Sequence, residues 1–181
     1  MPISAAMAEP ARAVDGGNGS GDKKILIVYY SRSGNTRALA EHIRAATGGD
    51  LLELQPAQPY PAEYKATTEQ AKRELESNYL PPLADAVPSV AAYDMVLVGS
   101  PNWWSTVAGP VRTFLSQTDL SGKPVAVFIT HEGSAFGRAL TDLSALCPNA
   151  KILEGLAIRG GRVKSAQPEI IEWLKKTGIT G

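Results

Sequence analysis

The chain has 181 residues, and its 18 Lys and Arg balance its 18 Asp and Glu, so the formal net charge is zero. A neutral chain offers neither the basic surface that nucleic acids require nor a strongly acidic docking surface. One cysteine, Cys147, excludes an internal disulfide, and because His42 and His131 are the two histidines, we expect no structural zinc site.

The chain divides by composition near residue 23. Residues 1–22 are mostly Ala, Gly, Ser, Pro and charged residues, and we expect a flexible tail there, whereas residues 23–181 have the length of one α/β domain. No apolar run approaches the ~20 residues that cross a bilayer. Ala5-Ala6-Met7-Ala8 resembles a cleavage site but lacks the basic and apolar regions that precede one, so we expect a cytoplasmic protein, with a processed export signal as the alternative.

Apolar strand patterns alternate with helical patterns from Lys23 onward. The expected strands are 24–30, 50–55, 94–100, 124–130 and 151–158. The expected helices are 36–46, 62–78, 106–116, 136–146 and about 168–176. The first, third and fourth strands are almost continuously apolar, which is typical of parallel strands covered on both faces. The alternation predicts an α/β fold with one doubly wound, five-stranded parallel sheet and helices on both faces.

Ligands of such sheets bind beyond the carboxyl ends of the strands, where the sequence predicts three ligand loops. The first is Ser31-Arg32-Ser33-Gly34-Asn35-Thr36, which opens directly onto a helix. The first N–H groups of a helix lack intrahelical partners and carry the positive end of its dipole, so this turn can hold a phosphate without a lysine. An ordinary polar turn, with Asn35 or Thr36 as the helix cap, is the alternative.

The second and third loops have the composition of a site for an aromatic ring. The second reads Ser100-Pro101-Asn102-Trp103-Trp104-Ser105-Thr106. Two adjacent indoles cannot both enter the sheet core easily, so at least one would expose apolar area that a flat ligand could cover. Packing of both rings on a helix or at a dimer interface is the alternative. The third, His131-Glu132-Gly133-Ser134-Ala135-Phe136-Gly137, can bring polar groups to the edge of a ring. His131 is a weak candidate for a catalytic group, because a lone histidine is more often a hydrogen-bonding group at the end of a loop.

These motifs and their intervals resemble the flavodoxin-like superfamily over residues 24–177, in particular a branch with a Pro-Asn-Trp-Trp flavin loop. The resemblance implies the strand order 2-1-3-4-5 and the cofactor FMN. It also implies three groups of cofactor-binding residues. These are Ser31, Arg32, Ser33, Gly34, Asn35 and Thr36 at the phosphate, Pro101, Asn102, Trp103 and Trp104 beside the isoalloxazine, and Thr130, His131, Glu132, Gly133 and Ser134 at the pyrimidine edge.

Motifs of other phosphate-binding classes are missing from the sequence. There is no Gly-x-x-x-x-Gly-Lys-Ser/Thr loop and no Gly-x-Gly-x-x-Gly after the first strand. A receiver domain would need acidic residues where Tyr29, Tyr30 and Ser31 stand, and a cysteine phosphatase would need Cys147 inside a phosphate loop.

The sequence favours an oxidoreductase over an electron carrier. Carrier flavodoxins tend to be strongly acidic, and they commonly have a glycine beside the flavin in the loop after the third strand, where Trp103-Trp104-Ser105 has none. Carriers stabilise the one-electron semiquinone by flipping a peptide in this loop beside that glycine, which tolerates positive φ, whereas positive φ at a bulky residue costs ~1–2 kcal/mol. We therefore expect electrons to pass in pairs from NAD(P)H, with NADPH as one candidate donor, through FMN to a quinone or other small acceptor. A flavodoxin serving protein partners and a flavin-free interaction domain are the alternatives, and a homodimer is left open.

A long proline-rich excursion separates the second and third strands. It begins at Gln55-Pro56-Ala57-Gln58-Pro59-Tyr60-Pro61 and continues through a charged helix to Pro81-Pro82. Proline makes such a segment semi-rigid. It could cover the flavin with Tyr60 or Tyr64, but we favour packing on the flank of the domain.

Overall fold

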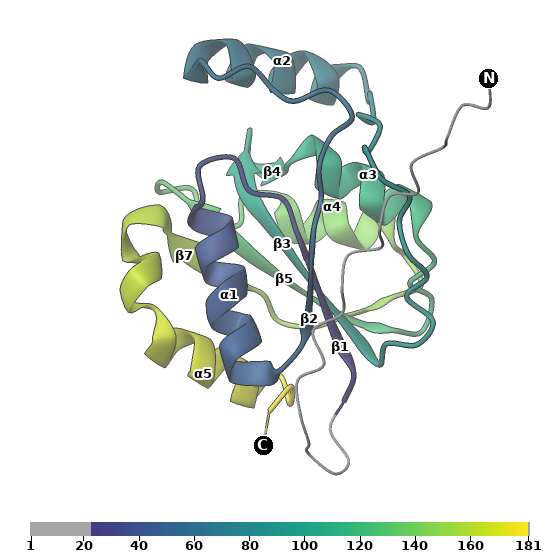
Figure 1. The fold of residues 1–181 in the computed structure, drawn as a ribbon, viewed down its shortest axis with the longest axis vertical. Helices are drawn as coiled ribbons and strands as arrows, with labels where there is room; N and C mark the ends of the chain where they lie inside the picture. Colours follow the sequence, from purple (N-terminus) through teal and green to yellow (C-terminus); the bar gives the residue numbers. More distant parts are fainter. Residues whose placement is uncertain (1–22, 181) are drawn as a thin grey trace, which may run out of the picture.

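The computed structural model describes residues 23–180, in which strands and helices alternate along the chain (Figure 1). The expected tail, 1–22, lies outside the described residues. The strands are β1 (Ile25–Tyr29), β2 (Asp50–Glu53), β3 (Met95–Trp103), β4 (Thr106–Val107), β5 (Pro124–His131), β6 (Lys151–Ile152) and β7 (Leu156–Arg159). The helices are α1 (Asn35–Thr47), α2 (Tyr64–Glu76), α3 (Gly109–Gln117), α4 (Ala139–Leu146) and α5 (Gln167–Lys176), with the 3-10 helix η1 (Gly160–Ser165) before the last.

The main sheet is parallel and has the order β2-β1-β3-β5-β6, which confirms the predicted order 2-1-3-4-5. In the register, Ile27 of β1 lies between Leu51 of β2 and Leu97 of β3. All five predicted strand regions therefore enter the sheet. Because successive parallel strands point the same way, the three candidate ligand loops leave the sheet at one edge.

The strand count differs from the prediction, since the sheet has seven strands instead of five. The region 151–158 divides into β6 and β7, which both pair with β5. The division falls where Gly155 passes so close to Phe136 that a Cβ atom there would lie 2.7 Å from the ring. Thr106 and Val107, expected to begin a helix, instead form β4 and pair antiparallel with the end of β3.

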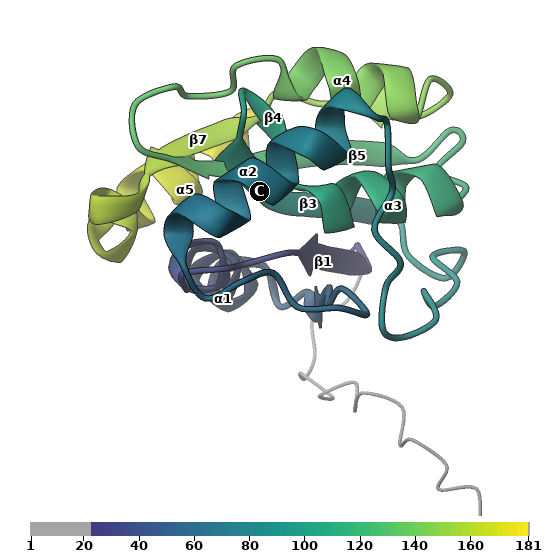
Figure 2. The same ribbon diagram turned by 90° about the horizontal axis from the view of Figure 1, so that it is seen from above.

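Helices cover both faces of the sheet, as predicted (Figures 1 and 2). Helices α1 and α5 lie on one face, where Leu39, Ile43 and Ile170 pack around the fully buried Ile27. Helices α3 and α4 cover the other face, where Phe114 is fully buried. Complete burial of an aliphatic or aromatic side chain of this size stabilises a fold by about 1.5–3 kcal/mol. The strands therefore form a rigid base beneath the loops at their carboxyl ends.

Helix α2 lies beyond the carboxyl edge of the sheet and covers neither face (Figures 1 and 2). Its buried residues are Thr67 and Ala71, whereas Tyr64 is 74% exposed. The Tyr60 hydroxyl before α2 donates a 2.6 Å hydrogen bond to the Glu74 carboxylate within it. The expectation that the excursion packs on the flank is therefore wrong for α2, whereas Pro81 after the helix does lie against α3, where its carbonyl accepts a 2.7 Å hydrogen bond from the Thr113 hydroxyl.

Candidate functional site

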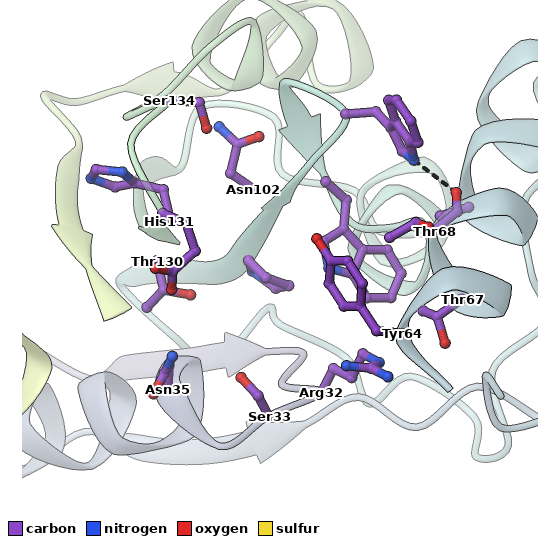
Figure 3. Close-up of a pocket in the computed structure, with 15 residues that line it drawn as sticks. Arg32, Ser33, Asn35, Tyr64, Thr67, Thr68, Asn102, Thr130, His131 and Ser134 are labelled. Carbon is purple, nitrogen blue, oxygen red and sulfur yellow. Dashed lines mark hydrogen bonds between the residues drawn. The ribbon is translucent and has the colours of Figure 1, made fainter. Parts of the chain in front are cut away.

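A cleft of about 710 Å³ opens at the carboxyl edge of the sheet (Figure 3). All three predicted loops line it. Their lining residues are Arg32, Ser33, Asn35, Pro101, Asn102, Trp103, Trp104, Thr130, His131, Glu132 and Ser134. The other predicted cofactor residues belong to the same loops but do not line the cleft, and these are Ser31, Gly34, Thr36 and Gly133.

The first loop ends in an uncapped helix N-terminus. Gly34 precedes α1 with a left-handed φ of 97°, and no side chain caps the helix. The Ser31 hydroxyl accepts a 3.1 Å hydrogen bond from the Gly34 N–H, while the buried Thr36 hydroxyl pairs with that of Thr130 at 2.8 Å. Neither Asn35 nor Thr36 is therefore the cap that an ordinary polar turn would have. The first N–H groups of α1 remain available for an anion.

The second loop is a tight hairpin between β3 and β4. Trp103 pairs with Thr106, and the two turn residues Trp104 and Ser105 have φ values of 53° and 67°. Positive φ at both central residues is the type I′ pattern, which matches the twist of adjacent strands. From sequence, the cost of positive φ at a bulky residue was expected to disfavour such a conformation. The backbone adopts it without glycine, so this argument for two-electron chemistry does not hold.

The two tryptophans have different environments. The Trp103 ring packs edge-on against Tyr30 and Tyr60, with centroid distances of 5.4 and 5.0 Å. Trp104 is 47% exposed, and its Nε1 atom donates a 2.8 Å hydrogen bond to the Thr68 carbonyl of α2. The expectation that the two indoles do not both enter the core is thus confirmed, with Trp104 left at the surface of the cleft.

Close contacts fix the third loop against the second. The Asn102 amide donates a 2.8 Å hydrogen bond to the Ala135 carbonyl. Gly137 has a φ of 51° and passes so near the hairpin that a Cβ atom there would lie 2.5 Å from the Ser105 carbonyl oxygen. Such contacts hold the walls of the cleft in one arrangement.

His131 lies at the end of β5 with a neutral imidazole favoured. Its Nδ1 atom accepts a 2.9 Å hydrogen bond from the Gly133 N–H, which leaves the proton of the neutral ring on Nε2. Burial lowers the pKa of His131, the positive charge of Arg159 lowers it further, and Glu132 acts in the opposite direction. A proton donor at Nε2 suits hydrogen bonding to a ring edge, and a catalytic role for His131 stays a prediction.

Helix α2 supplies the lining residues that the sequence analysis did not place in the site. They are Tyr64, Thr67, Thr68 and Ala71 (Figure 3). Tyr64 was considered as part of a cover, but the threonines gave no signal, since Thr in a charged helix reads as solvated surface. The sparse apolar pattern of residues 62–78 was the available clue, because it indicates a helix that has little contact with the core.

Within residues 23–180, no three or more His, Cys, Asp or Glu side chains gather as they would around a metal ion. Across the same stretch, each helix is too short or too polar to cross a membrane.

Known proteins resemble this chain in sequence and structure. A family model described as flavodoxin matches residues 24–177. A protein from Bacteroides eggerthii assigned as a flavoprotein is 29% identical, with a TM-score of 0.78 over 88% of this chain and 100% of its own. A flavoprotein from Lactobacillus acidophilus, solved in complex with FMN, is 27% identical, with a TM-score of 0.70 over 83% of this chain and 98% of its own.

Flavodoxin 2 from Bacillus cereus, at 23% identity and a TM-score of 0.51 over 84% of this chain and 99% of its own, shares the fold. The resemblance to flavodoxin-like proteins is therefore confirmed, and the Pro-Asn-Trp-Trp branch stays a prediction. Because the family model spans nearly all of the described residues, the chain belongs to the flavodoxin family.

Proposed function

We propose that this chain binds FMN in the cleft at the carboxyl edge of its sheet. The observation that carries the proposal is the convergence of three different surfaces on one cleft: the uncapped start of α1, the tryptophan hairpin and the polar loop after β5. The first suits a phosphate, the second a flat apolar ring and the third the polar edge of that ring. The FMN complex of the 27% identical Lactobacillus acidophilus flavoprotein supports the same cofactor.

The proposed roles follow the chemistry of each loop. The N–H groups at the start of α1 and the hydroxyls of the first loop would hold the phosphate, and Trp104 would cover ring surface. The loop Thr130–Ser134 would face the pyrimidine edge, where His131 can donate from Nε2. Bound FMN supplies the exchange of one or two electrons, and the protein supplies its orientation and electrostatic surroundings.

We further propose that the chain is an oxidoreductase that takes electrons from NAD(P)H and passes them to a quinone or another small acceptor. Helix α2 supports this, because it forms one side of the cleft and adds lining beside the three cofactor loops. A net charge of zero also gives no long-range steering toward a charged protein partner.

An electron-transfer protein that serves protein partners is the second candidate. Tyr64 and Trp104, at 74% and 47% exposure, place aromatic surface at the edge of the cleft, and aromatic residues are enriched at protein interfaces. Steady-state oxidation of NAD(P)H by the purified chain, without a separate reductase, separates the candidates: the oxidoreductase turns over and the carrier does not. A flavin-free interaction domain would be colourless and would not bind added FMN.

A pair of glycine variants tests where FMN binds. Gly34 and Gly48 stand at the two ends of α1 with φ values of 97° and 71°, and a Cβ atom at either would meet nothing within 4 Å. Gly34→Ala and Gly48→Ala should therefore lose similar stability, about 1–2 kcal/mol each. Calorimetric titration with FMN should show at least about tenfold weaker binding for Gly34→Ala alone, because Gly34 belongs to the proposed phosphate loop and Gly48 does not. A tenfold change in affinity corresponds to about 1.4 kcal/mol.

The wild-type chain provides the decisive control for this pair. If it does not bind FMN even at millimolar concentration, the proposed function is wrong. If the two variants lose affinity equally, FMN binds but its phosphate does not lie at the start of α1.

A further inference from the structure

The α2 side of the cleft lies outside the three loops assigned to the cofactor. Tyr64, Thr67, Thr68 and Ala71 line it, and none belongs to the segments 31–36, 100–106 or 130–134. The loop that carries His131 and Ser134 forms the other side (Figure 3). The cofactor loops therefore do not account for the whole cleft, and the α2 side offers surface to a second molecule.

Two aromatic rings meet at the α2 side, Tyr64 of the helix and Trp104 of the hairpin that contacts it, and each has a cation beside it. The Arg32 guanidinium lies 5.8 Å from the Tyr64 ring centroid, and the Lys72 ammonium lies 5.4 Å from the Trp104 ring centroid. Both rings are substantially exposed, at 74% for Tyr64 and 47% for Trp104. Such cation–π contacts contribute about 0.5–1 kcal/mol at exposed sites, and they keep positive charge close to flat apolar surface.

The charges of both cations remain available to a ligand. The Lys72 ammonium has the Glu76 carboxylate at 3.9 Å, in an exposed pair that is weak in water. Arg32 donates one 2.9 Å hydrogen bond to the Ala62 carbonyl, which uses one of its five N–H donors and does not neutralise its charge. The cleft's acidic lining residue, Glu132, belongs to the loop on the opposite side. Arg32 thus brings one positive charge to the lining of the cleft, and Lys72, which does not line the cleft itself, brings a second beside Trp104.

We propose that the α2 side of the cleft binds the second substrate, and that this substrate is a planar aromatic anion, such as a ring bearing a carboxylate, sulfonate or phosphate. A flat ring packs against Tyr64, beside the cofactor ring that Trp104 would cover, and the anionic group is attracted by Arg32 and Lys72. As a statement about a substrate, this rests on the proposed oxidoreductase function, but the binding itself can be measured without any reaction.

Two redox-inert probes test the proposal. Naphthalene-2-sulfonate and naphthalene-2-sulfonamide have the same ring, and only the first is an anion. Calorimetric titration of the FMN-loaded chain should give severalfold tighter binding of the sulfonate, and this preference should shrink as salt rises, because exposed charges are screened. Lys72→Gln should lower sulfonate affinity about threefold and Lys72→Glu about tenfold, with sulfonamide affinity unchanged.

Arg73→Gln is the matched control, since it removes one positive charge from the next residue of α2. Among the contacts of the described residues, the Arg73 side chain lies over neither ring. It should leave the sulfonate preference unchanged. Equal binding of both probes, binding of neither, a preference that survives in Lys72→Glu, or an equal loss in Arg73→Gln would each overturn the proposal.

Failure of the proposed function is read separately, from FMN absorbance and NAD(P)H oxidation. If the chain takes up no FMN, the same titrations of the chain without FMN decide the inference, because the Lys72 dependence does not require the cofactor.

Discussion

The indole Nε1 atom of Trp104 donates a 2.8 Å hydrogen bond to the carbonyl oxygen of Thr68, and this contact joins the β3–β4 hairpin to helix α2. Few other interactions hold the helix, since Thr67 and Ala71 are its buried residues. The Tyr60–Glu74 and Arg32–Ala62 hydrogen bonds fix the segment that leads into it. The position of α2, and with it one side of the cleft, therefore depends on a small number of polar contacts.

Trp104→Phe should loosen α2 without unfolding the domain. The variant keeps an aromatic ring but loses the N–H group that reaches Thr68. A hydrogen bond contributes about 0.5–1.5 kcal/mol net, so amide hydrogen exchange in residues 64–76 should become roughly three- to tenfold faster. Trp173→Phe is the matched control, because Trp173 donates an equivalent 2.8 Å hydrogen bond to the Glu154 carbonyl on another part of the fold. Unchanged exchange of α2 in Trp104→Phe would show that the contact does not hold the helix.

Gly137→Ala should be among the most damaging small substitutions in the site. Gly122→Ala provides the comparison: both residues have positive φ, 51° and 70°, but an added Cβ meets Ser105 only at Gly137. The backbone cost of about 1–2 kcal/mol is common to both variants. Contact with the Ser105 backbone should add about 1–3 kcal/mol to the loss in Gly137→Ala. Urea denaturation measures the difference, and equal losses would mean that the hairpin moves aside freely.

The central strands could be predicted from sequence because strands that are buried on both faces have a recognisable apolar pattern. Ile27, Val98 and Val127 are fully buried between two helical layers, and such strands must be apolar at nearly every position. The three ligand loops follow from these strands, because parallel strands bring their carboxyl ends to one edge. All of the predicted cofactor residues consequently belong to loops that line one cleft, and most of them line it themselves.

The placement of α2 could not be predicted in the same way. A helical pattern identifies a helix but not the surface it lies on, and α2 is positioned by contacts far apart in sequence, such as Trp104 with Thr68. The hairpin was misjudged for a similar reason. Local propensity assigns positive φ to glycine, whereas strand pairing and the contact with α2 hold Trp104 in this conformation.

Stability should fall at alkaline pH because of the buried tyrosines beneath the hairpin. The pKa of Tyr30 is raised from 10.0 to about 12, chiefly by burial; the positive charge of Arg32 opposes this rise, and the negative charges of Glu74 and Glu53 contribute to it. A raised folded-state pKa gives stability that is complete below pH 10 and is lost as pH rises toward 12. Ionisation of Tyr30 should therefore lower the free energy of unfolding by about 1 kcal/mol between pH 9 and pH 11.

Tyr30→Phe tests this dependence, since it keeps the ring that packs against Trp103 but has no proton to lose. Urea denaturation at pH 9 and pH 11 should show a smaller loss for the variant than for the wild type. Identical losses would place the alkaline sensitivity elsewhere, and Tyr60 is then the next residue to examine, because burial and Glu74 raise its pKa as well.

The imidazole of His131 should titrate below its ordinary value of 6.5, because burial and then Arg159 lower its pKa while Glu132 raises it. Neutral His131 is favoured in the folded chain, so its contribution to stability is present above that ordinary pKa and is lost as pH falls. Two charge-removing variants should move the pKa in opposite directions: Arg159→Gln upward and Glu132→Gln downward. Titration of the ring protons by NMR measures all three proteins. A wild-type pKa above 6.5, or a shift in the same direction in both variants, would mean that other groups control the charge at this edge of the cleft.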